Sequence, residues 1–272
     1  MKLNNKTIVV TGSTRGIGRA IAEACAKEGA RVVICSRQES AVKQTCKTFK
    51  QQNLYVSGIP VDVSIEGDLE KLLQHAIEAW GRVDVWINNA GLSGGFRPLQ
   101  EMSTEEIRAL VEVNLTATLN ACRIIIPYFI TQGGGILINM SGKGGRGDAS
   151  PFLSTYAATK AAITSLTKSL AQENKPHPIS IHSVMPGMVA TDFYKDMKTS
   201  PKLVATTQSL PHVLKAFGVP ADAVGRFFVQ IAAQEPGKVT GKTYSLVSGW
   251  RLIRAVGLMT WYRVTGKIKK TV

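Results

Sequence analysis

Tyr156 and Lys160 are residues whose types and spacing could carry out acid–base chemistry. They lie four positions apart in a segment with a helical pattern, so their side chains share one helix face. A tyrosine hydroxyl ordinarily titrates near pH ~10, and a neighbouring ammonium group lowers that pKa by stabilising the phenolate. The pair therefore predicts a proton donor and acceptor that works near neutral pH. Ser141 strengthens this interpretation because it ends a predicted strand, where ligands of open α/β sheets bind.

A glycine-rich turn near the N-terminus could hold the phosphates of a dinucleotide. It lies between an apolar strand pattern over residues 7–10 and a helical pattern over residues 17–28. Gly12 permits a tight turn, while Gly16 and Gly18 remove side chains that would separate the pyrophosphate from the helix start. Free N–H groups and the positive end of the helix dipole would meet the phosphates there. The residues expected to bind are Gly12, Ser13, Thr14, Arg15, Gly16, Ile17 and Gly18.

The end of the second predicted strand, residues 31–35, bears on the choice between NAD and NADP. An NAD-selective site usually places an acidic residue there to accept from the ribose 2′-hydroxyl. This chain has Ser36 and Arg37 instead, which removes a repelling carboxylate and supplies a cation suited to a 2′-phosphate. Arg15 could approach from the other side. We predict NADP(H) as the cofactor; the alternative is that Arg37 is only a solvated surface cation.

Strand and helix patterns alternate along the whole chain, which predicts a doubly wound parallel sheet, an α/β fold, in one domain over residues 1–249. Strands are expected over 7–10, 31–35, 54–59, 83–91 with its exit, 136–141, 179–184 and 243–246. Helices are expected over 17–28, 38–52, 66–80, 104–131, around Tyr156 and Lys160, and over 221–233. Residues 192–219 are irregular, as a mobile lid over a site would be.

Two polar positions have both a functional and a structural interpretation. Asp62, followed by Val63, comes just after the third predicted strand, where it could accept from an adenine amino group or cap the next helix. Asn114 lies in the middle of a predicted helix among apolar residues, where a buried amide must be hydrogen-bonded. It could belong to the site or be a satisfied core amide.

The amino-acid composition limits which cellular compartment and which partners are expected. The 272 residues carry a net charge of +14, of which +8 comes from the segment after Glu235, which lacks acidic residues. This local excess does not indicate a general nucleic-acid surface, and we expect no nucleic-acid partner. Four separated cysteines and four histidines show no metal-ligand spacing, so no metal is expected. The early first strand and the absence of an 18-residue apolar run predict a cytoplasmic protein without a leader or membrane span.

The C-terminal segment, residues 250–272, is predicted to be a basic amphipathic extension. Trp250, Ile253, Val256 and Met259 recur on one helical face, with arginines among them. Such a helix could lie on an anionic membrane surface. It could equally pack against a partner subunit or over the mouth of the substrate site, and the sequence leaves both possibilities open.

Taken jointly, the motifs resemble those of the short-chain dehydrogenase/reductase family over about residues 5 to 248. The matching elements are Thr11-Gly12-x-x-x-Gly16-x-Gly18, Asn88-Asn89-Ala90-Gly91, Asn114, Ser141, Tyr156-x-x-x-Lys160 and Pro186-Gly187-x-Val189-x-Thr191. The resemblance implies a seven-stranded Rossmann sheet and assembly as a homodimer or homotetramer. It also implies that Tyr156 is the catalytic acid/base and that Ser141 holds the substrate carbonyl.

The same resemblance implies the remaining site roles. Lys160 would hold the nicotinamide ribose and depress the Tyr156 pKa, and Asn114 would anchor a water in the proton relay. The carboxamide would be bound by Val189 and Thr191 in the segment that begins at Pro186 and Gly187. The adenosine half would be bound by Asn89 and Asp62, next to Val63, Ala90 and Gly91.

A narrower similarity is to the chlorophyll b reductase branch of that family. It lies in Trp86–Gly91, Gly95–Leu99, Asn139-Met140-x-Gly142 and Pro186–Val189. It implies reduction of the formyl group of chlorophyll b to hydroxymethyl. We therefore expect an NADPH-dependent reductase of a small hydrophobic carbonyl substrate. The alternatives are a ketone or 3-oxoacyl reductase of unassigned pathway, or a non-catalytic NADPH-binding regulatory protein.

Overall fold

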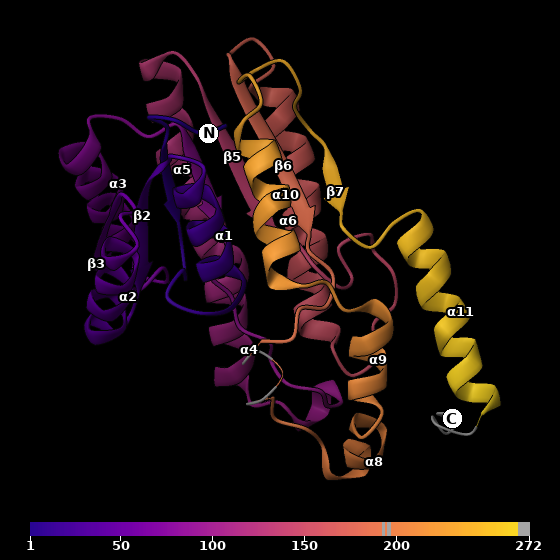
Figure 1. Cartoon of the computed structure of the whole chain (residues 1–272). Helices are drawn as coiled ribbons and strands as arrows, with labels where there is room; N and C mark the ends of the chain where they lie inside the picture. The colour runs from indigo at the N-terminus through magenta and orange to yellow at the C-terminus, as the bar shows by residue number, and fades with distance from the viewer. Residues whose placement is uncertain (192–193, 195–196, 266–272) are drawn as a thin grey trace.

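The computed structural model describes residues 1–191, 194 and 197–265, apart from the Arg263 side chain. Seven parallel strands form one sheet in the order β3-β2-β1-β4-β5-β6-β7 (Figure 1). They are β1 (Thr7–Val10), β2 (Arg31–Ser36), β3 (Val56–Pro60), β4 (Val85–Asn88), β5 (Gly135–Met140), β6 (Ile179–Met185) and β7 (Thr243–Ser245). The prediction of a doubly wound, seven-stranded Rossmann sheet in a single domain is confirmed.

Helices cover both faces of this sheet. On one face lie α1 (Gly16–Lys27), α2 (Glu39–Gln51) and α10 (Ala221–Ala232), and on the other α3 (Glu66–Trp80), α5 (Ala117–Gln132) and α6 (Ser154–Glu173). Successive strand residues point to opposite faces, so Ile8 joins the first hydrophobic core and Val9 the second. Because both faces are buried, the central strands β1, β4 and β5 are mostly apolar.

The helix expected over residues 104–131 is interrupted. It consists of α4 (Thr104–Val111), a π-helical segment η2 (Glu112–Thr116) and α5. The α4 start follows the expected capping box, in which Ser103 and Glu106 satisfy each other's backbone N–H groups. The interruption holds Asn114, and π-helical insertions of this kind are frequent at functional sites.

The same run, Thr104–Gln132, is the one helix of the described chain that is long and apolar enough to cross a membrane by length and composition. The sequence-based expectation that no segment qualifies is therefore wrong by that criterion. Ala121, Ile125 and Phe129 of this run are nevertheless fully buried in the core beneath the sheet. It packs as a core helix.

The segment expected to be an irregular lid contains short helices where it is described. They are η3 (Pro201–Leu203), α8 (Val204–Thr207) and α9 (Leu210–Phe217), while residues 192–193 and 195–196 lie outside the described part. Isolated parallel bridges join Phe96 to Thr199 and Met188 to Gly218. A preceding 3₁₀ turn, η1 (Leu99–Glu101), lies in the loop that carries Phe96.

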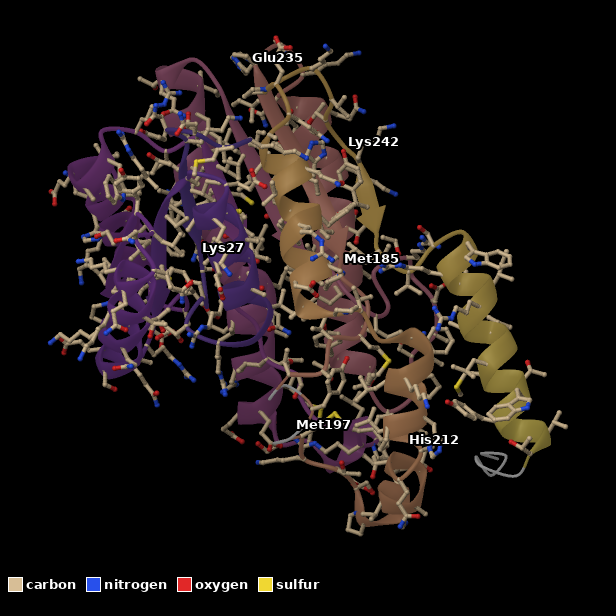
Figure 2. The ribbon with its side chains drawn as sticks, in the orientation of Figure 1. Lys27, Met185, Met197, His212, Glu235 and Lys242 are labelled. Atoms are coloured by element: carbon tan, nitrogen blue, oxygen red, sulfur yellow. The ribbon has the colours of Figure 1, made fainter. Side chains whose placement is uncertain are left out.

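The extension predicted over residues 250–272 forms α11 (Trp250–Val264), and residues 266–272 lie outside the described residues. Helix α11 packs on α9 (Figure 1). His212, labelled on α9 in Figure 2, has its ring edge-on to the Tyr262 ring at 5.0 Å between centroids. Ala255 and Tyr262 are buried in this contact, whereas Trp250 is 76% exposed. The apolar residues left in solvent thus differ from the predicted face, because Met259 turns partly towards the protein.

Candidate active site

Tyr156 and Lys160 lie near the carboxyl ends of β4 and β5. Lys160 is 4% exposed, and its Nζ donates to the carbonyl oxygen of Met140, the last residue of β5, at 2.9 Å. The Lys160 Nζ also lies 5.6 Å from the centroid of the Tyr156 ring. The predicted pair therefore shares one buried face of α6, with its ammonium group beside the phenol.

Burial dominates the titration of both groups. It lowers the pKa of Lys160 from 10.5 to about 8. Burial also raises the pKa of Tyr156 well above its usual range, and the Tyr194 phenol raises it further. The expectation that Lys160 depresses the Tyr156 pKa is not met in this structure, because desolvation of the phenolate outweighs the nearby cation. Tyr156 is held as a protonated hydroxyl, which suits a proton donor.

Ser141 is placed differently from the expectation. Its hydroxyl lies 3.1 Å from the carbonyl oxygen of Lys160, to which it donates, and 2.9 Å from Oγ1 of Thr164. Both partners belong to α6, and Ser141 is 2% exposed. In this structure the hydroxyl joins the end of β5 to α6, and the predicted role of Ser141 in holding a substrate carbonyl stays a prediction.

Asn114 is a satisfied core amide. Its side chain makes a reciprocal pair with Leu92, accepting from the backbone N–H at 2.7 Å and donating to the carbonyl at 2.9 Å. The π-helical segment brings this amide beside Gly91, where a Cβ would lie 3.2 Å from its Oδ1 and 3.8 Å from Lys160 Nζ. The amide thus holds the loop after β4, and the expected anchoring of a water by Asn114 stays a prediction.

The glycine turn is closed by Asn89. The Asn89 Nδ2 group donates to the carbonyl oxygens of Thr11 at 2.8 Å and Gly12 at 3.1 Å. A Cβ at Gly18 would lie 2.3 Å from Gly12 O and 2.4 Å from Asn89 Nδ2, so only glycine fits there. Gly12 has a φ of +62° and its Cβ would lie 2.9 Å from Ala90 Cα. The Asn89 Nδ2 group therefore braces the turn, and the expected adenosine contact of this residue stays a prediction.

Ser13 also serves the turn. Its hydroxyl donates to Val10 O at 2.6 Å and accepts from Cys35 N at 3.0 Å, and its own N–H donates to Cys35 O. With no exposed surface, Ser13 cannot reach a ligand. The prediction of a cofactor contact is corrected for this residue. Thr14, Arg15, Gly16 and Ile17 keep some solvent exposure at the helix start.

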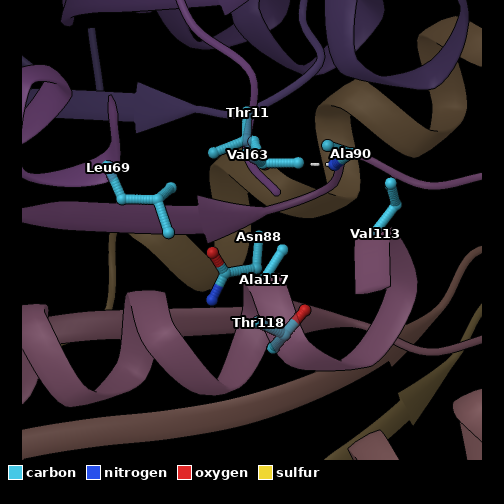
Figure 3. A pocket seen from close by; sticks show the side chains of 8 residues that line it. All are labelled: Thr11, Val63, Leu69, Asn88, Ala90, Val113, Ala117 and Thr118. Carbon is cyan, nitrogen blue, oxygen red and sulfur yellow. Dashed lines mark hydrogen bonds between the residues drawn. The ribbon is translucent and has the colours of Figure 1, made fainter. Parts of the chain in front are cut away.

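Behind the turn lies a small cavity at the adenosine side of the expected cofactor site (Figure 3). It is lined by Thr11, Val63, Leu69, Asn88, Ala90, Val113, Ala117 and Thr118. Asp62 directly precedes Val63 of this lining. The Asp62 Oδ1 atom accepts from the N–H of Ser64 at 3.0 Å and from the Ser64 hydroxyl at 2.6 Å. Asp62 therefore stabilises a local turn. It does not cap α3, because Ile65 occupies the N-cap position of that helix, without a side-chain hydrogen bond. The expected adenine contact of Asp62 stays a prediction.

The end of β2, which is expected to select NADP, lies next to the glycine turn. Hydrogen bonds between Ser13 and Cys35 join the two segments. The Ser36 hydroxyl donates to Gln38 O at 3.3 Å. Arg37 and Arg15 are both exposed, and within the described part of the chain neither has an ion-pair partner. Two free cations and no neighbouring carboxylate at Ser36 suit an added phosphate group.

The loop after β6 reaches the same turn. Thr191 Cβ lies 3.7 Å from where a Cβ at Gly16 would stand, so this loop closes over the helix start. Val189 is buried in the core and offers only its backbone to a ligand. Pro186 is buried and Gly187 exposed, which leaves the backbone of this loop as the surface facing the turn.

A second cavity adjoins Tyr156 on the side of the loop after β4. Its lining consists of Ser93, Gly94, Gly95, Arg97, Met102, Phe152, Leu153, Ser154, Thr155 and Tyr156. The Phe152 ring packs edge-on against Phe96 at 5.4 Å between centroids. This cavity is the candidate substrate pocket, and glycines and apolar side chains make up much of its wall.

Two features of the site were not predicted from the sequence. Glu106 accepts from both Arg97, at 3.0 Å, and Lys198, at 2.7 Å, which ties the loop after β4 to the segment before η3. These cations hold the pKa of Glu106 at about 2. Tyr194 comes from the same distant segment, and nothing local to its position signals a place beside Tyr156.

The cradle around the turn fits a dinucleotide. Gly12 and Gly18 are required by close backbone approach, the first turn of α1 lacks acidic residues, and a cavity follows the edge where β1 and β4 end. The described histidines, cysteines and carboxylates nowhere gather into a group of three that could bind a metal ion.

Comparison with known proteins gives the same picture. The family described as short chain dehydrogenase matches residues 6–202. The chain is 31% identical to dehydrogenase/reductase SDR family member 4 of Bos taurus over 91% of this chain and 88% of that protein. It is 33% identical to the chlorophyll(ide) b reductase NOL, chloroplastic, of Arabidopsis thaliana, over 82% of this chain and 64% of that protein.

A probable chlorophyll(ide) b reductase, chloroplastic, of Oryza sativa subsp. japonica is 35% identical over 70% of this chain and 42% of its own length. The chain thus spans about half to two thirds of these plant relatives. Among solved structures, an actinorhodin polyketide ketoreductase with NADPH matches with a TM-score of 0.78 and 26% identity, covering 90% of this chain and 97% of that chain. A 3-ketoacyl-(acyl-carrier-protein) reductase from Brucella melitensis with NADH gives 0.77 at 24% identity, covering 89% and 97%.

Proposed function

The chain belongs to the short-chain dehydrogenase family, and from that premise we propose that it is an NADPH-dependent reductase in which Tyr156 protonates the oxygen of a substrate carbonyl. The observation that carries the proposal is the Tyr156–Lys160 pair on one face of α6, with Lys160 buried and Tyr156 half-buried, beside a glycine turn that fits a dinucleotide. The proposed catalytic group is the Tyr156 hydroxyl, and Lys160 supplies the neighbouring cation.

The residues perform complementary tasks in this mechanism. A reduced nicotinamide, when bound, supplies the hydride for the carbonyl carbon. Tyr156 is protonated at neutral pH because burial raises its pKa, so its hydroxyl donates to the carbonyl oxygen. After it gives up the proton, the phenolate is stabilised by the Lys160 cation, 5.6 Å from the ring centroid. The Lys160 pKa of about 8 leaves this amine mostly charged near neutral pH and able to return a proton.

The proposed preference for NADPH rests on Ser36, Arg37 and Arg15. Replacing Arg37 with alanine removes one exposed cation without changing any described ion pair. We expect the Michaelis constant for NADPH to rise about tenfold, in line with loss of a charge-assisted hydrogen bond, while that for NADH stays constant. Arg108→Ala on α4, which also removes an exposed cation without breaking a described ion pair, is the matched control. An equal effect on both cofactors would contradict the proposed selectivity.

For the substrate, we propose a hydrophobic carbonyl compound, and in first place the formyl group of chlorophyll b. The support is the 33–35% identity to proteins named chlorophyll(ide) b reductase. The cavity beside Tyr156 adds apolar surface from Met102, Phe152 and Leu153. A ketone or 3-oxoacyl substrate is the second candidate, favoured by the likeness to an actinorhodin polyketide ketoreductase.

The test is NADPH oxidation with solubilised chlorophyll b, followed at the absorption bands of the pigment, beside a small ketone and an acyl thioester. Tyr156→Phe should keep NADPH binding and abolish turnover. Conversion of the ketone or thioester but not of the pigment would assign the second substrate class. Tight NADPH binding without turnover of any substrate would contradict an enzyme and favour a regulatory protein.

We also propose that α11 touches an anionic membrane surface. Trp250, Ile253, Trp261 and Val264 are exposed on the face away from α9, and Arg251 and Arg254 are exposed near them. Co-sedimentation with vesicles of phosphatidylglycerol should exceed that with phosphatidylcholine and fall in Trp250→Ser/Ile253→Ser. Equal binding to both vesicles would exclude the electrostatic part of this contact.

A homo-oligomer is proposed as well, since Leu119 and Ile130 are exposed apolar side chains on α5, at 42% and 38%. Light scattering during gel filtration measures the assembly directly. A monomer at all concentrations would contradict the proposal. The predicted cytoplasmic location stays a prediction, and two of the relatives above are named as chloroplastic.

A further inference from the structure

A chain of hydrogen-bonded side chains crosses the protein core from β4 to α6. Trp86 Nε1 donates to Asn88 Oδ1 at 2.8 Å, and Asn88 Nδ2 donates to Asn139 Oδ1 at 2.9 Å. Asn139 Nδ2 donates to Thr167 Oγ1 at 3.1 Å, and the Thr167 hydroxyl donates to the carbonyl oxygen of Ile163 at 2.8 Å. Asn139 and Thr167 have no exposed surface. Neither of these two side chains therefore meets a ligand.

The direction of each bond in this chain follows from the indole at its start. An indole N–H can only donate, so the oxygen of the Asn88 amide faces Trp86. The Asn88 nitrogen then faces Asn139, which turns its oxygen to Asn88 and its nitrogen to Thr167. The oxygen and the nitrogen of both amides thus have partners. A buried polar network that is satisfied in this way specifies one arrangement of the elements that it joins.

The two ends of this chain lie beside the two halves of the candidate site. Asn88 directly precedes Asn89, whose amide braces the glycine turn. Thr167 follows Lys160 on α6 by about two helical turns, so the two side chains share one face of the helix. Asn139 joins Asn88 to Thr167. One buried amide thus links the strand that leads to the cofactor turn with the helix that carries the catalytic pair.

The bond to Thr167 is one of three polar contacts that join a single face of α6 to residues 139–141. They pair Asn139 with Thr167, Met140 with Lys160, and Ser141 with Thr164. Apolar packing is non-directional and would by itself permit α6 to slide along its axis. Hydrogen bonds have preferred lengths and angles, so a slide of α6 would break all three contacts together. Asn139 and Thr167 line neither cavity of the site, and a change in them acts there only through α6.

We propose that Asn139 and Thr167 are positioning residues, which fix α6 along its axis and so hold Tyr156 and Lys160 in place relative to the cofactor turn. The proposal rests on the function proposed above, with Tyr156 as proton donor. Without the Asn139–Thr167 bond α6 is free to shift, and the Tyr156 hydroxyl then meets the carbonyl oxygen in a poorer geometry. A misplacement of about 1 Å can cost ~100-fold in rate. The same shift admits water to Lys160, which is 4% exposed.

The test removes the Thr167 hydroxyl and keeps the volume of the side chain. With NADPH and whichever of the three substrates above the wild type converts, Thr167→Val should lower kcat at least ~10-fold. The Michaelis constant for NADPH should stay within ~3-fold, because the variant leaves the glycine turn intact. Thr167→Ser keeps the hydroxyl and should restore kcat to within ~3-fold of the wild type.

Thr45→Val on α2 is the matched control. Thr45 is 3% exposed, and its hydroxyl donates to the carbonyl oxygen of Ala41 at 2.8 Å, four residues before it, as the Thr167 hydroxyl does to Ile163. It lies outside the chain of amides. Thr45→Val should lower the free energy of unfolding in urea without changing kcat.

Two further readouts separate positioning from a loss of stability. Loss of the Lys160 charge limits kcat on the alkaline side, and the midpoint of that limb should rise by at least ~0.5 pH unit in Thr167→Val, because water moves the lysine pKa back towards its ordinary value. The ¹³C signal of Lys160 Cε, assigned with Lys160→Met, should show the same rise without any substrate. Thr45→Val should change neither titration.

Failure of the inference and failure of the proposed function give different results. Wild-type kcat in Thr167→Val, or a loss of kcat without a shift in the Lys160 titration, would overturn the positioning role. Full activity of Tyr156→Phe, or no turnover by the wild type, would remove the proposed function, and the Lys160 signal then still shows whether the amide chain places α6. If Thr167→Val does not fold, Thr167→Ala beside Thr45→Ala gives the same comparison, since the smaller side chain lets water satisfy Asn139 Nδ2 without tying it to α6.

Discussion

His182 is a buried titratable group outside the site, and its position predicts how the protein responds to acid. It lies on β6 with no exposed surface, and both ring nitrogens lack a hydrogen-bond partner within the described structure. The ring meets Tyr244 edge-on at 5.3 Å between centroids. Burial first, and then the nearby Lys242 cation, lowers the pKa of His182 from 6.5 to about 4.

The sign and size of the effect follow from linkage. The folded pKa lies below the unfolded one, so as the pH falls the unfolded chain takes up the proton first. His182 therefore does not affect the pH dependence above about pH 7, and it destabilises the fold progressively between about pH 6.5 and pH 4. For these two pKa values the free energy of unfolding should fall by about 2 kcal/mol between about pH 7.5 and pH 5.

The perturbation is His182→Leu, which removes the proton site and both unpaired ring nitrogens from the buried strand β6. Urea unfolding of the variant and the wild type at matched pH values gives the difference in the free energy of unfolding. We expect that difference to be small at neutral pH and to grow in favour of the variant by about 2 kcal/mol at about pH 5. A constant difference across this range would refute the reasoning, because the acid response would then belong to other groups.

Three further outcomes are expected. Gly18→Ala should weaken NADPH binding at least ~10-fold in a fluorescence titration, because its Cβ would lie 2.3 Å from Gly12 O; affinity equal to that of Gly67→Ala would contradict this. Glu106→Gln should speed limited proteolysis near Lys198 several-fold, since the carboxylate bridges two segments, and unchanged cleavage would show that the bridge holds nothing. Asn114→Ala should lower the free energy of unfolding by about 1–3 kcal/mol in urea, because the Leu92 backbone pair loses its partner, and a loss near zero would argue against a buried, satisfied amide.

The sequence predicted the parts of this molecule that depend on local spacing. The sheet follows from alternating apolar runs, and the Tyr156–Lys160 pair follows from a helical period of nearly four. The requirement for Gly18 follows from a strand, turn and helix in succession. Each of these is settled within about twenty residues of chain, where steric and hydrogen-bonding rules act directly.

Contacts between segments far apart in the chain could not be predicted from local spacing. The direction of the Ser141 hydroxyl depends on Thr164, which lies 23 positions away on α6. A residue type alone does not say which way a rotamer points. From the sequence, the Asn89 amide could bind either a ligand or the backbone of the glycine turn. In the structure its Nδ2 group donates to the turn, beside Gly18. Glu106 and Lys198 are separated by 92 positions, and Tyr194 reaches the site from a segment without a regular pattern.

The turn that Asn89 closes has a consequence for the thermodynamics of ligand binding. Thr11, Ser13 and Asn89 hold its backbone through hydrogen bonds that exist before any nucleotide arrives. The conformational entropy of the glycine turn is therefore lost when the protein folds and not when the cofactor binds. Titration calorimetry of the cofactor should accordingly report little ordering from this half of the site, and the entropy change that is measured reflects the loops on the substrate side.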